Sequence, residues 1–401
     1  MKTAKEIIDG LDGVLSLSQI AKLYFGKSRS WLYNKKDEAI VNGVKSEFSI
    51  DDLGRLSEAL KDVANKISLA SKEIAQIKET SERESGVYYT LKYNPFDHPL
   101  FMAWADMLPQ STTWLEPFAG VCSIPMMLQN MDIKPMWRCY DINPLKTTLD
   151  GFKVSKRDTI AKFPNGYKIC VTNPPFLSKN SASKRKLPFP DCDFDDIYKL
   201  SLSLALANCE YVAMILPESF ITSGLFQERL YGVISVPQEL FFDTECPVCV
   251  ALFTPDTTYD FVVYVGERLV GNYATLNQYR LNLEQYKSDT WRFNDPTGTI
   301  AVKCFDSQKG RDIRFLRGDA IPSDNIKGTS RSYTRISGLP STIDIDLFID
   351  RCNLTLMDYR DKTQDVFLTS YKGMRDDGCY RRRIDFGTIR HILSKVLNEM
   401  A

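Results

Sequence analysis

The residues Asn173-Pro174-Pro175-Phe176 directly follow a short apolar run, Tyr167–Thr172. An apolar run that stops at two prolines is typical of a buried strand followed by a rigid loop, because proline fixes φ and has no backbone N–H. We therefore expect the Asn173 side chain and nearby carbonyls to face the space above the strand end. These acceptors can bind both hydrogens of an exocyclic amine while Phe176 stacks on the attached ring. The pattern indicates methyl transfer to the amino group of a planar base.

Three further segments end apolar runs earlier in the chain. They are Glu116-Pro117-Phe118-Ala119-Gly120, Asp141-Ile142, and Asp158. Nucleotide-like ligands bind at the carboxyl ends of strands in open α/β sheets. Gly120 allows close backbone approach, and Asp141 follows it at about 20 residues, the spacing at which an acid binds ribose hydroxyls. Asp158 is suited to accept from an adenine amino group, so the four segments together predict a nucleotide-cofactor site.

Short apolar strands that alternate with helical stretches position these residues, which is the pattern of an α/β sheet. We expect strands near Thr113–Glu116, Met136–Tyr140, Lys168–Thr172, Tyr211–Leu216 and Val248–Phe253. The chain is expected to divide into an all-α module (1–80), a catalytic domain (81–258) and an α+β target-recognition region (259–401). The last region is expected to end in a helix around Thr388–Leu397.

The N-terminal module is expected to be wholly helical. Between Gln19 and Leu32 it has the Ala21, turn Gly26 and later apolar anchor of a helix-turn-helix, with one residue more than usual between Ala21 and Gly26. This segment resembles small uncharacterised helix-turn-helix-like proteins of the Bacteroidetes, a resemblance that implies no activity. The alternative is a helical packing module that does not bind DNA.

A heptad-like seam follows, in which apolar residues from Leu53 to Ile77 alternate steps of three and four. A seam this narrow suits one partner helix. The helix either pairs with a copy of itself or packs along the first two helices, and we expect the homodimer.

Charge, apolar runs and cysteines each bear on the class of protein. The 401 residues include 51 basic and 51 acidic side chains, so net charge does not indicate a nucleic-acid partner. The sequence has no apolar run of membrane-spanning length and no apolar signal core at its start. Its ten cysteines are scattered, and the close pair Cys246 and Cys249 lies in a strand-like run, so we expect no metal site. Reduced thiols and a cytoplasmic location are expected.

With these motifs in order, the region from Gly86 to about Phe253 resembles the S-adenosylmethionine-dependent N6-adenine DNA methyltransferases of type II restriction systems and phages. Gly86-Val87-Tyr88-Tyr89-Thr90 corresponds to the family segment that closes over the cofactor methionine, and Ala213–Phe220 to its fifth-strand segment. The segment order is the γ arrangement. The chain departs from the family at Gly120-Val121-Cys122, where Gly-x-Gly is usual, and the Cβ of Cys122 is expected to crowd the methionine.

The resemblance implies a Rossmann-like class I methyltransferase fold with a mixed sheet and S-adenosyl-L-methionine as cofactor. The cofactor-binding residues that it implies are Tyr89, Thr90, Glu116, Pro117, Phe118, Ala119, Gly120, Asp141, Ile142, Asp158 and Asn173. It implies a flipped-out adenine in double-stranded DNA. The Asn173 oxygen and the Pro174 carbonyl would accept from N6, Phe176 would stack on the base, and no covalent enzyme intermediate would form. A cognate restriction endonuclease is the implied partner, with restriction-modification or phage DNA protection as the setting.

Basic clusters are the expected DNA contacts. One directly follows the catalytic loop and suits a flexible, phosphate-binding segment. The others interleave with tyrosines in the C-terminal region. The predicted residues are Lys179, Lys184, Arg185, Lys186, Arg331, Arg335, Lys372, Arg375, Arg381, Arg382 and Arg383.

Two alternatives to an active adenine methyltransferase remain open. Ribosomal-RNA guanine-N2 and release-factor glutamine methyltransferases share Asn-Pro-Pro-aromatic loops, but Gly86–Thr90 and the large C-terminal region disfavour them. A DNA-binding regulator with an inactive methyltransferase core is favoured by the helix-turn-helix-like start and the Gly120-Val121-Cys122 loop. The intact Asn173–Phe176 and Asp141 disfavour it.

Overall fold

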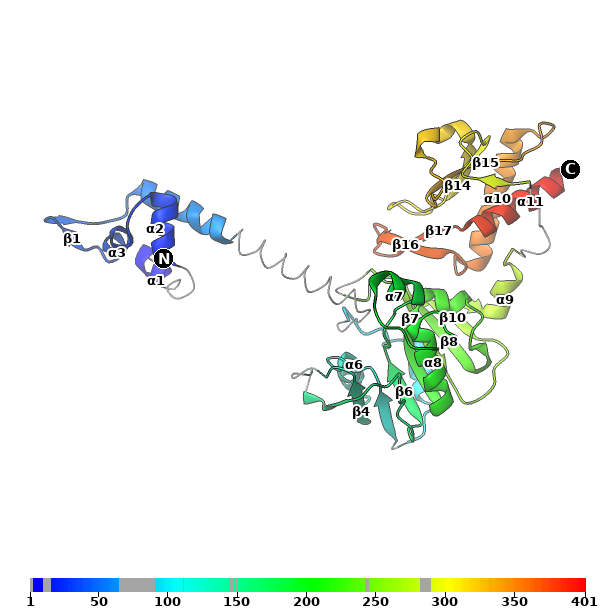
Figure 1. Ribbon diagram of the computed structural model, residues 1–401, viewed down its shortest axis with the longest axis horizontal. Coiled ribbons are helices and arrows are strands. Elements are labelled where there is room, and N and C mark those ends of the chain that lie inside the picture. Colours follow the sequence, from blue (N-terminus) through cyan, green and yellow to red (C-terminus); the bar gives the residue numbers. More distant parts are fainter. Residues whose placement is uncertain are drawn as a thin grey trace. The chain divides into compact units, whose positions relative to one another are not determined.

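The computed structural model describes residues 3–9, 16–64, 91–110, 112–144, 148, 151–241, 245–281 and 290–401. The chain divides into two compact units, Met1–Ser81 and Glu82–Ala401 (Figure 1). The division into three domains, with a second boundary at 258, stays a prediction.

A nine-stranded mixed sheet is the centre of the larger unit, and its order is β5-β4-β3-β6-β7-β9-β8-β10-β11. The strands are β3 (Thr113–Glu116), β4 (Met136–Asp141), β5 (Val154–Lys156), β6 (Ile169–Thr172), β7 (Tyr211–Pro217), β8 (Leu230–Val236), β9 (Val248–Phe253), β10 (Val262–Val265) and β11 (Arg268–Asn272). Strand β9 runs antiparallel to both β7 and β8, and β11 runs antiparallel to β10. The predicted α/β class with a large mixed sheet is confirmed, although the sheet extends beyond the boundary predicted at 258.

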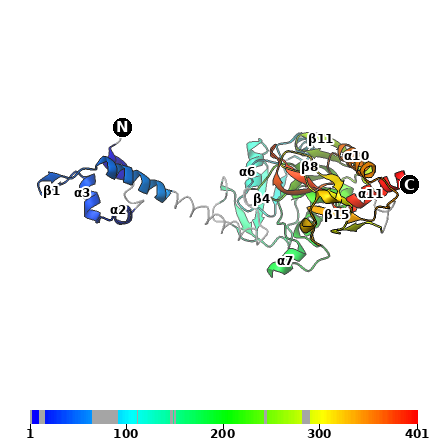
Figure 2. The same cartoon turned by 90° about the horizontal axis from the view of Figure 1, so that it is seen from above.

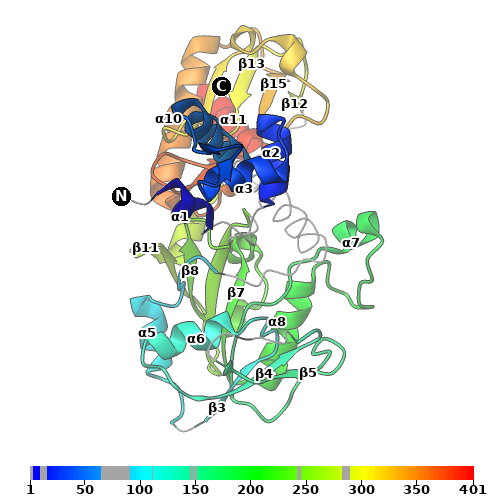
Figure 3. The same cartoon turned by 90° about the vertical axis from the view of Figure 1, so that its left-hand side faces the viewer.

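Both faces of this sheet are covered, which explains why its central strands read as continuous apolar runs. In β6, Ile169 and Val171 face α5 (Pro99–Ala105) and α6 (Ser123–Asn130). The residue between them, Cys170, belongs to the opposite core with α8 (Ile197–Asn208), η2 (Glu218–Thr222) and α9 (Tyr273–Gln278). Figure 3 shows α6 and α8 on the two sides of the central strands.

The C-terminal part of the unit has its own sheet of order β12-β15-β13-β14. The elements are β12 (Arg292–Phe293), β13 (Ile300–Lys303), β14 (Arg314–Arg317), β15 (Tyr333–Ser337), α10 (Ile345–Thr363), the hairpin β16 (Thr369–Met374) and β17 (Tyr380–Arg383), and α11 (Phe386–Met400). This part also has the short 3-10 turns η4 (Gly318–Ala320) and η5 (Ser323–Asn325), and another, η3 (Gln227–Arg229), directly precedes β8 of the large sheet. Helices α10 and α11 share one apolar core with the sheet. The helix expected at Thr388–Leu397 lies within α11, whereas α10 was not predicted.

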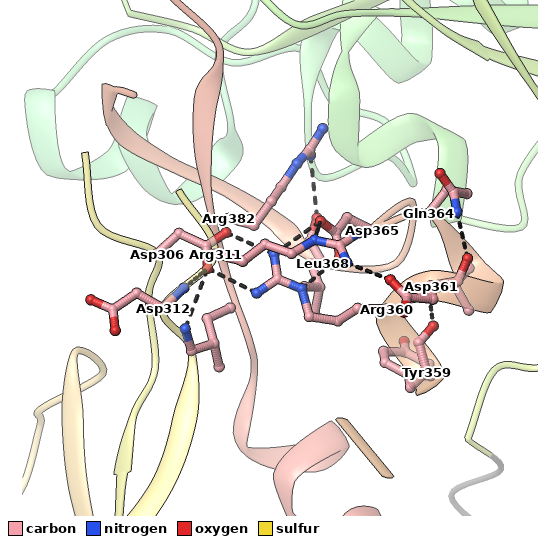
Figure 4. A network of polar contacts seen from close by, with 12 residues as sticks. Asp306, Arg311, Asp312, Tyr359, Arg360, Asp361, Gln364, Asp365, Leu368 and Arg382 are labelled. Atoms are coloured by element: carbon pink, nitrogen blue, oxygen red, sulfur yellow. Dashed lines mark hydrogen bonds and ion pairs between the residues drawn. The ribbon is translucent and has the colours of Figure 1, made fainter. Parts of the chain in front are cut away.

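A buried ion triad holds α10 to the rest of this part (Figure 4). The Arg360 guanidinium, 3% exposed, donates two hydrogen bonds of 2.8 Å to the carboxylate of Asp306, which is fully buried. It also bonds Asp365 at 2.8 and 2.9 Å. Burial acts to raise the pKa of Asp306, but the hydrogen bonds and charge of Arg360 hold that pKa below its ordinary value. Asp306 is therefore ionised throughout the neutral range.

The smaller unit contains α1 (Ala4–Asp9), α2 (Leu17–Phe25), α3 (Arg29–Lys36), the hairpin β1 (Ile40–Val41) and β2 (Val44–Lys45), and a helical stretch over 50–64. The prediction of a wholly helical module is wrong. Asn42 and Gly43 take φ values of 52° and 80°, which suit the tight turn of a two-residue hairpin.

Only the first part of the predicted heptad helix lies within the described residues. There, Leu56 and Ala59 are buried with Ile8, Leu17 and Leu32 of the same unit. This part of the helix therefore packs along the first three helices. Residues 65–77 of the seam lie outside the described residues, and the homodimer stays a prediction.

Two properties of the described residues bear on function. None of their helices is both long enough and apolar enough to cross a membrane. No group of three or more His, Cys, Asp or Glu side chains among them could hold a metal ion.

Candidate functional site

The strand order reverses between β3 and β6, because the chain proceeds from β3 through β4 to β5 on one side and from β6 to β7 on the other. These five strands are parallel, so their carboxyl ends meet at one edge of the sheet. A crevice at such a reversal is the preferred ligand-binding place in open α/β sheets. The segments that begin at Glu116, Asp141, Asp158 and Asn173 all start at this edge.

Glu116 bridges the two strands on either side of the reversal. Its carboxyl accepts a hydrogen bond from the Phe118 N–H at 3.1 Å and another from the Thr172 hydroxyl at the end of β6. The side chain is 1% exposed, and burial raises its pKa well above the ordinary value, although both hydrogen bonds oppose the rise. The glycine loop and the Asn173 loop are thus linked through one buried carboxyl group.

Asp141 fixes the glycine loop from the neighbouring strand. One carboxylate oxygen accepts from the Gly120 N–H at 3.0 Å, and the other from the Asn143 N–H at 2.8 Å. Gly120 has φ of 50°, in the left-handed region that glycine adopts at little cost. Since a carboxylate offers about four acceptor positions, Asp141 retains capacity for further hydrogen bonds.

Cys122 also has a left-handed backbone, with φ of 65°, at the start of α6. Its side chain is fully buried in a small cluster with Ala119 and Cys139, beside Trp137 and Phe152. The Cys122 side chain therefore packs into this core. The expected crowding of a cofactor methionine by Cys122 stays a prediction.

The third acid, Asp158, is exposed after β5. One of its oxygens accepts from the backbone N–H groups of Ile160 and Ala161 at 3.1 and 3.0 Å. The neighbouring Thr159 donates its hydroxyl to the Pro117 carbonyl at 3.0 Å, which joins this turn to the glycine loop. Ile142, beside Asp141, is 54% exposed and offers an apolar surface at the same edge.

Asn173 is half-buried where β6 ends, and Pro174 behind it is buried. The ring of Phe176 meets Tyr198 at 6.4 Å and 87° and Phe241 at 6.4 Å and 72°, both edge-on. These contacts fix the plane of Phe176.

The end of this loop depends on Asp196, which sequence reasoning missed. Asp196 accepts from the Leu177 N–H at 3.2 Å and caps α8 at the Tyr198 N–H. The signal was present, because an aspartate directly before an apolar helical run is typical of an N-cap. Thr172 was missed as well, since its role depends on Glu116, which lies 56 positions earlier in the sequence.

Three predicted site residues cannot be placed in full. Tyr89 and Thr90, with the rest of Gly86–Thr90, lie outside the described residues. Lys372 lies on β16, but its side chain is also outside them.

The basic segment that follows Asn173–Phe176 is a helix, α7 (Lys179–Arg185), whereas we expected a flexible segment. Ser178 caps it through the Ser181 N–H, and Ala182 is buried. The side chains of Lys179, Lys184, Arg185 and Lys186 are exposed. Figures 2 and 3 both show α7 projecting from the body of the larger unit.

The basic residues of β17 divide by strand alternation into inward and outward side chains. Arg381 lies 5.2 Å and Arg383 5.7 Å from the centre of the Tyr371 ring, which stacks on Phe305 at 5.3 Å. Tyr333 contacts Phe305 edge-on at 5.4 Å. We call these five residues, Phe305, Tyr333, Tyr371, Arg381 and Arg383, the aromatic–basic surface.

Arg382 has a different role from the predicted DNA contact. Its guanidinium is buried and bonds Glu218, directly after β7, at 2.9 and 3.0 Å, and the Ser370 hydroxyl at 2.8 Å. The ion pair of Arg382 and Glu218 attaches the β16–β17 hairpin to the large sheet.

Among the other predicted DNA contacts, Arg331 is exposed, Arg335 donates to the Gly298 carbonyl at 3.1 Å, and Arg375 pairs with Asp377 at 2.6 Å.

Comparisons with known proteins match parts of the chain. Residues 4–74 match a family model described as a domain of unknown function, DUF5053. No curated protein matches the sequence. Among solved structures, the methyltransferase subunit of a type I restriction-modification system from Streptococcus thermophilus is 14% identical, with 41% of this chain and 44% of that chain covered and a TM-score of 0.30.

A second similar structure is the M protein of the type I restriction enzyme EcoKI. It is 16% identical, with 65% of this chain and 70% of that chain covered and a TM-score of 0.31. This chain spans less than half of the length of the Streptococcus subunit. At these identities and TM-scores, neither similarity identifies a reaction or a substrate.

Proposed function

We propose that the chain is an S-adenosylmethionine-dependent DNA methyltransferase that modifies N6 of a flipped-out adenine. The observation that carries the proposal is the link across the strand reversal. Through Glu116, the glycine loop that suits a nucleotide cofactor is hydrogen-bonded to Thr172, the residue directly before Asn173. A cofactor site and an amine-binding loop at one edge of the sheet suit group transfer between their ligands.

The residues at this edge fit the proposed cofactor. Asp141 would accept from the ribose hydroxyls with the acceptor positions left by Gly120 and Asn143. The exposed face of Ile142 would pack on the adenine ring, and Asp158 would accept from its amino group with the oxygen that does not bond Ile160 and Ala161. S-adenosylmethionine would supply an electrophilic methyl group on its sulfonium.

The target amine would be activated by acceptors and not by a general base. The Asn173 side-chain oxygen and the Pro174 carbonyl would accept from the two N6 hydrogens and draw the nitrogen towards tetrahedral geometry. Phe176, with its plane fixed by Tyr198 and Phe241, would stack on the base. Positioning and electrostatic stabilisation would then supply most of the acceleration.

DNA would be held on two sides of the site. The exposed cations of α7, which follow the catalytic loop, suit phosphate contacts. The aromatic–basic surface, which lies in the predicted target-recognition region, suits stacking on bases and contacts with the DNA backbone. Modification of DNA for restriction-modification or phage protection, with a cognate endonuclease, is the setting that we propose.

The test is methyl transfer from radiolabelled S-adenosylmethionine to unmethylated genomic DNA, with the modified base identified. Wild type is compared with Asn173→Ala and with Asn277→Ala, an exposed asparagine of α9 that serves as the matched control. We expect label in N6-methyladenine at a fixed motif, loss of label in Asn173→Ala, and wild-type activity in Asn277→Ala.

Label on ribosomal RNA or on protein, with none on DNA, would contradict the adenine proposal and favour the rival methyltransferases. Absence of label on all three would favour the regulator with an inactive core.

A further inference from the structure

The smaller unit contains a helix-turn-helix whose turn is well defined. Gly26, with φ of 62°, caps α2 directly after its last residue, Phe25, and the Lys27 N–H donates to the Ala21 carbonyl at 3.0 Å, as in glycine-terminated helices. Ser28 then caps α3 through the Trp31 N–H at 3.3 Å. A turn of three residues between two helices is the connection found in DNA-binding helix-turn-helix motifs.

One side of α3 is anchored within its own unit. Leu32 is 1% exposed in the core. The Lys36 ammonium pairs with Asp9 of α1 at 2.6 Å, and the Lys35 ammonium pairs with Asp52 at 2.8 Å. The two lysines near the end of α3 are thus neutralised by acids and hold the helix in place.

The remaining side of α3 carries two adjacent i, i+4 rows, Arg29–Tyr33 and Ser30–Asn34. Arg29 and Ser30 are exposed, and the Arg29 guanidinium lies 4.8 Å from the centre of the Tyr33 ring. Arginine and asparagine are the side chains that pair with guanine and adenine edges in the major groove. The motif places its second helix in that groove, with residues near its start on the bases.

Charged side chains are unevenly paired in this unit, although its net charge is close to zero. Asp37 pairs with Lys5, and Glu38 and Glu47 both pair with Lys45, in addition to the pairs made by Asp9 and Asp52. Within residues 3–9 and 16–64, no ion pair includes Lys22, Lys27 or Arg29, which surround the turn. Among these described residues, no acid therefore pairs with the positive charges of the turn and the start of α3.

We propose that this helix-turn-helix is a second DNA-binding site, separate from the adenine site. Helix α3 would enter the major groove and read base edges with Arg29 and Asn34, while Lys22 and Lys27 contact phosphates. The hairpin β1–β2 directly follows α3, and its exposed Ile40 and Val44 would lie against deoxyribose. The proposal does not depend on methyl transfer.

The experiment selects bound duplexes from a random-sequence library with the full chain and then measures affinity by fluorescence anisotropy, without S-adenosylmethionine. Arg29→Gln combined with Asn34→Ala is compared with Arg55→Gln, which removes the same charge from an exposed site in the 50–64 helix. We expect the double variant to lose on the order of tenfold or more in affinity and to relax the selected sequence. Arg55→Gln should bind as wild type does.

A second measurement uses Lys27→Gln, an exposed turn residue whose replacement threatens no packing. It should weaken binding to all duplexes similarly and reduce the slope of log affinity against log salt by about one. An unchanged slope would overturn the proposal, as would equal losses in Arg55→Gln and the double variant.

The competing use of the surface is docking of a second copy of this chain. Light scattering of the wild type and of Ile40→Ser/Val44→Ser tests it. Wild-type DNA affinity in Arg29→Gln/Asn34→Ala, together with a dimer that the hairpin variant abolishes, would assign the surface to self-association and overturn the DNA proposal. Loss of DNA affinity in the double variant would support the second site even in a chain that transfers no methyl group.

Discussion

Glu116 and Asp306 are both buried carboxyl groups, but they differ in what holds them. Asp306 faces the Arg360 guanidinium, and its pKa is lowered despite its burial. Glu116 is held by a hydroxyl and a backbone N–H, and burial raises its pKa. The comparison teaches that the same burial has opposite outcomes: a cationic partner keeps the pKa of one carboxyl group low, whereas neutral donors leave the pKa of the other raised.

The largest effect is expected from Arg360→Met. Removal of the guanidinium leaves Asp306 and Asp365 buried without their cation, which we expect to lower the free energy of unfolding by about 3–5 kcal/mol. Urea unfolding measures it. Adding Asp306→Asn and Asp365→Asn should recover part of the loss, and a loss below that of a surface ion pair would show that the triad does not hold α10.

A change in pH should alter the contributions of these two carboxyl groups to the free energy of unfolding in opposite directions. Because the pKa of Asp306 is lowered on folding, its contribution to stability is present above the unfolded value of about 3.9 and is lost as pH falls through the folded pKa. Asp306→Asn should therefore cost about 2 kcal/mol at pH 7, and the difference from wild type should shrink in acid.

For Glu116 the pKa is raised on folding, so its contribution is fully present below the unfolded value of about 4.3 and is lost as pH rises through the folded pKa. Glu116→Gln, which cannot ionise, should gain stability relative to wild type as pH rises. Denaturant unfolding of both variants from pH 3 to pH 9 checks both signs. If the stabilities of the two variants relative to wild type changed with pH in the same direction, the difference proposed between the two carboxyl groups would be contradicted.

A smaller effect is expected from Thr172→Val, which keeps the shape of a fully buried side chain but deletes the hydroxyl that donates to Glu116. We expect a loss of about 1–2 kcal/mol in the free energy of unfolding. The pKa of Glu116 should rise further, since this hydrogen bond lowers it. Thr275→Val on the exposed face of α9 is the matched control, and equal losses in the two variants would show that Glu116 does not need this donor.

The smallest effect is expected from Arg317→Gln. Arg317 pairs with Asp346 at 2.5 Å, but their side chains are 54% and 65% exposed. Solvent screens such a pair, so we expect urea unfolding of Arg317→Gln to be nearly that of the wild type. A loss comparable with that of Arg360→Met would remove the contrast between exposed and buried pairs.

The sequence predicted the elements whose signals are local. Five strands of the large sheet were predicted because they are short apolar runs, and the β6 loop was predicted because Pro174 and Pro175 follow its run directly. Helix α10 was missed because its buried face includes Arg360, a charged residue that breaks the apolar periodicity. The hairpin β1–β2 was missed although Asn42-Gly43 is a strong hairpin signal.

The role of Arg382 could not be predicted from its neighbours. Arg381, Arg382 and Arg383 read as one basic cluster, but strand alternation turns Arg382 towards Glu218, which lies 164 positions earlier. A basic cluster in sequence therefore does not specify which members reach a ligand and which are internal partners.

The pair formed by Glu218 and Arg382 also limits how this chain can exchange parts with others. Recombination that replaced residues 290–401 with a foreign segment of the same fold would bring a new hairpin against the end of β7. Unless the incoming hairpin carried a cation in the place of Arg382, the half-buried carboxylate of Glu218 would keep, among the described residues outside the hairpin, only the Ser235 hydroxyl at 2.5 Å as a side-chain partner. Viable chimeras should therefore either keep Glu218 together with a cation at the position of Arg382 or lose both charges.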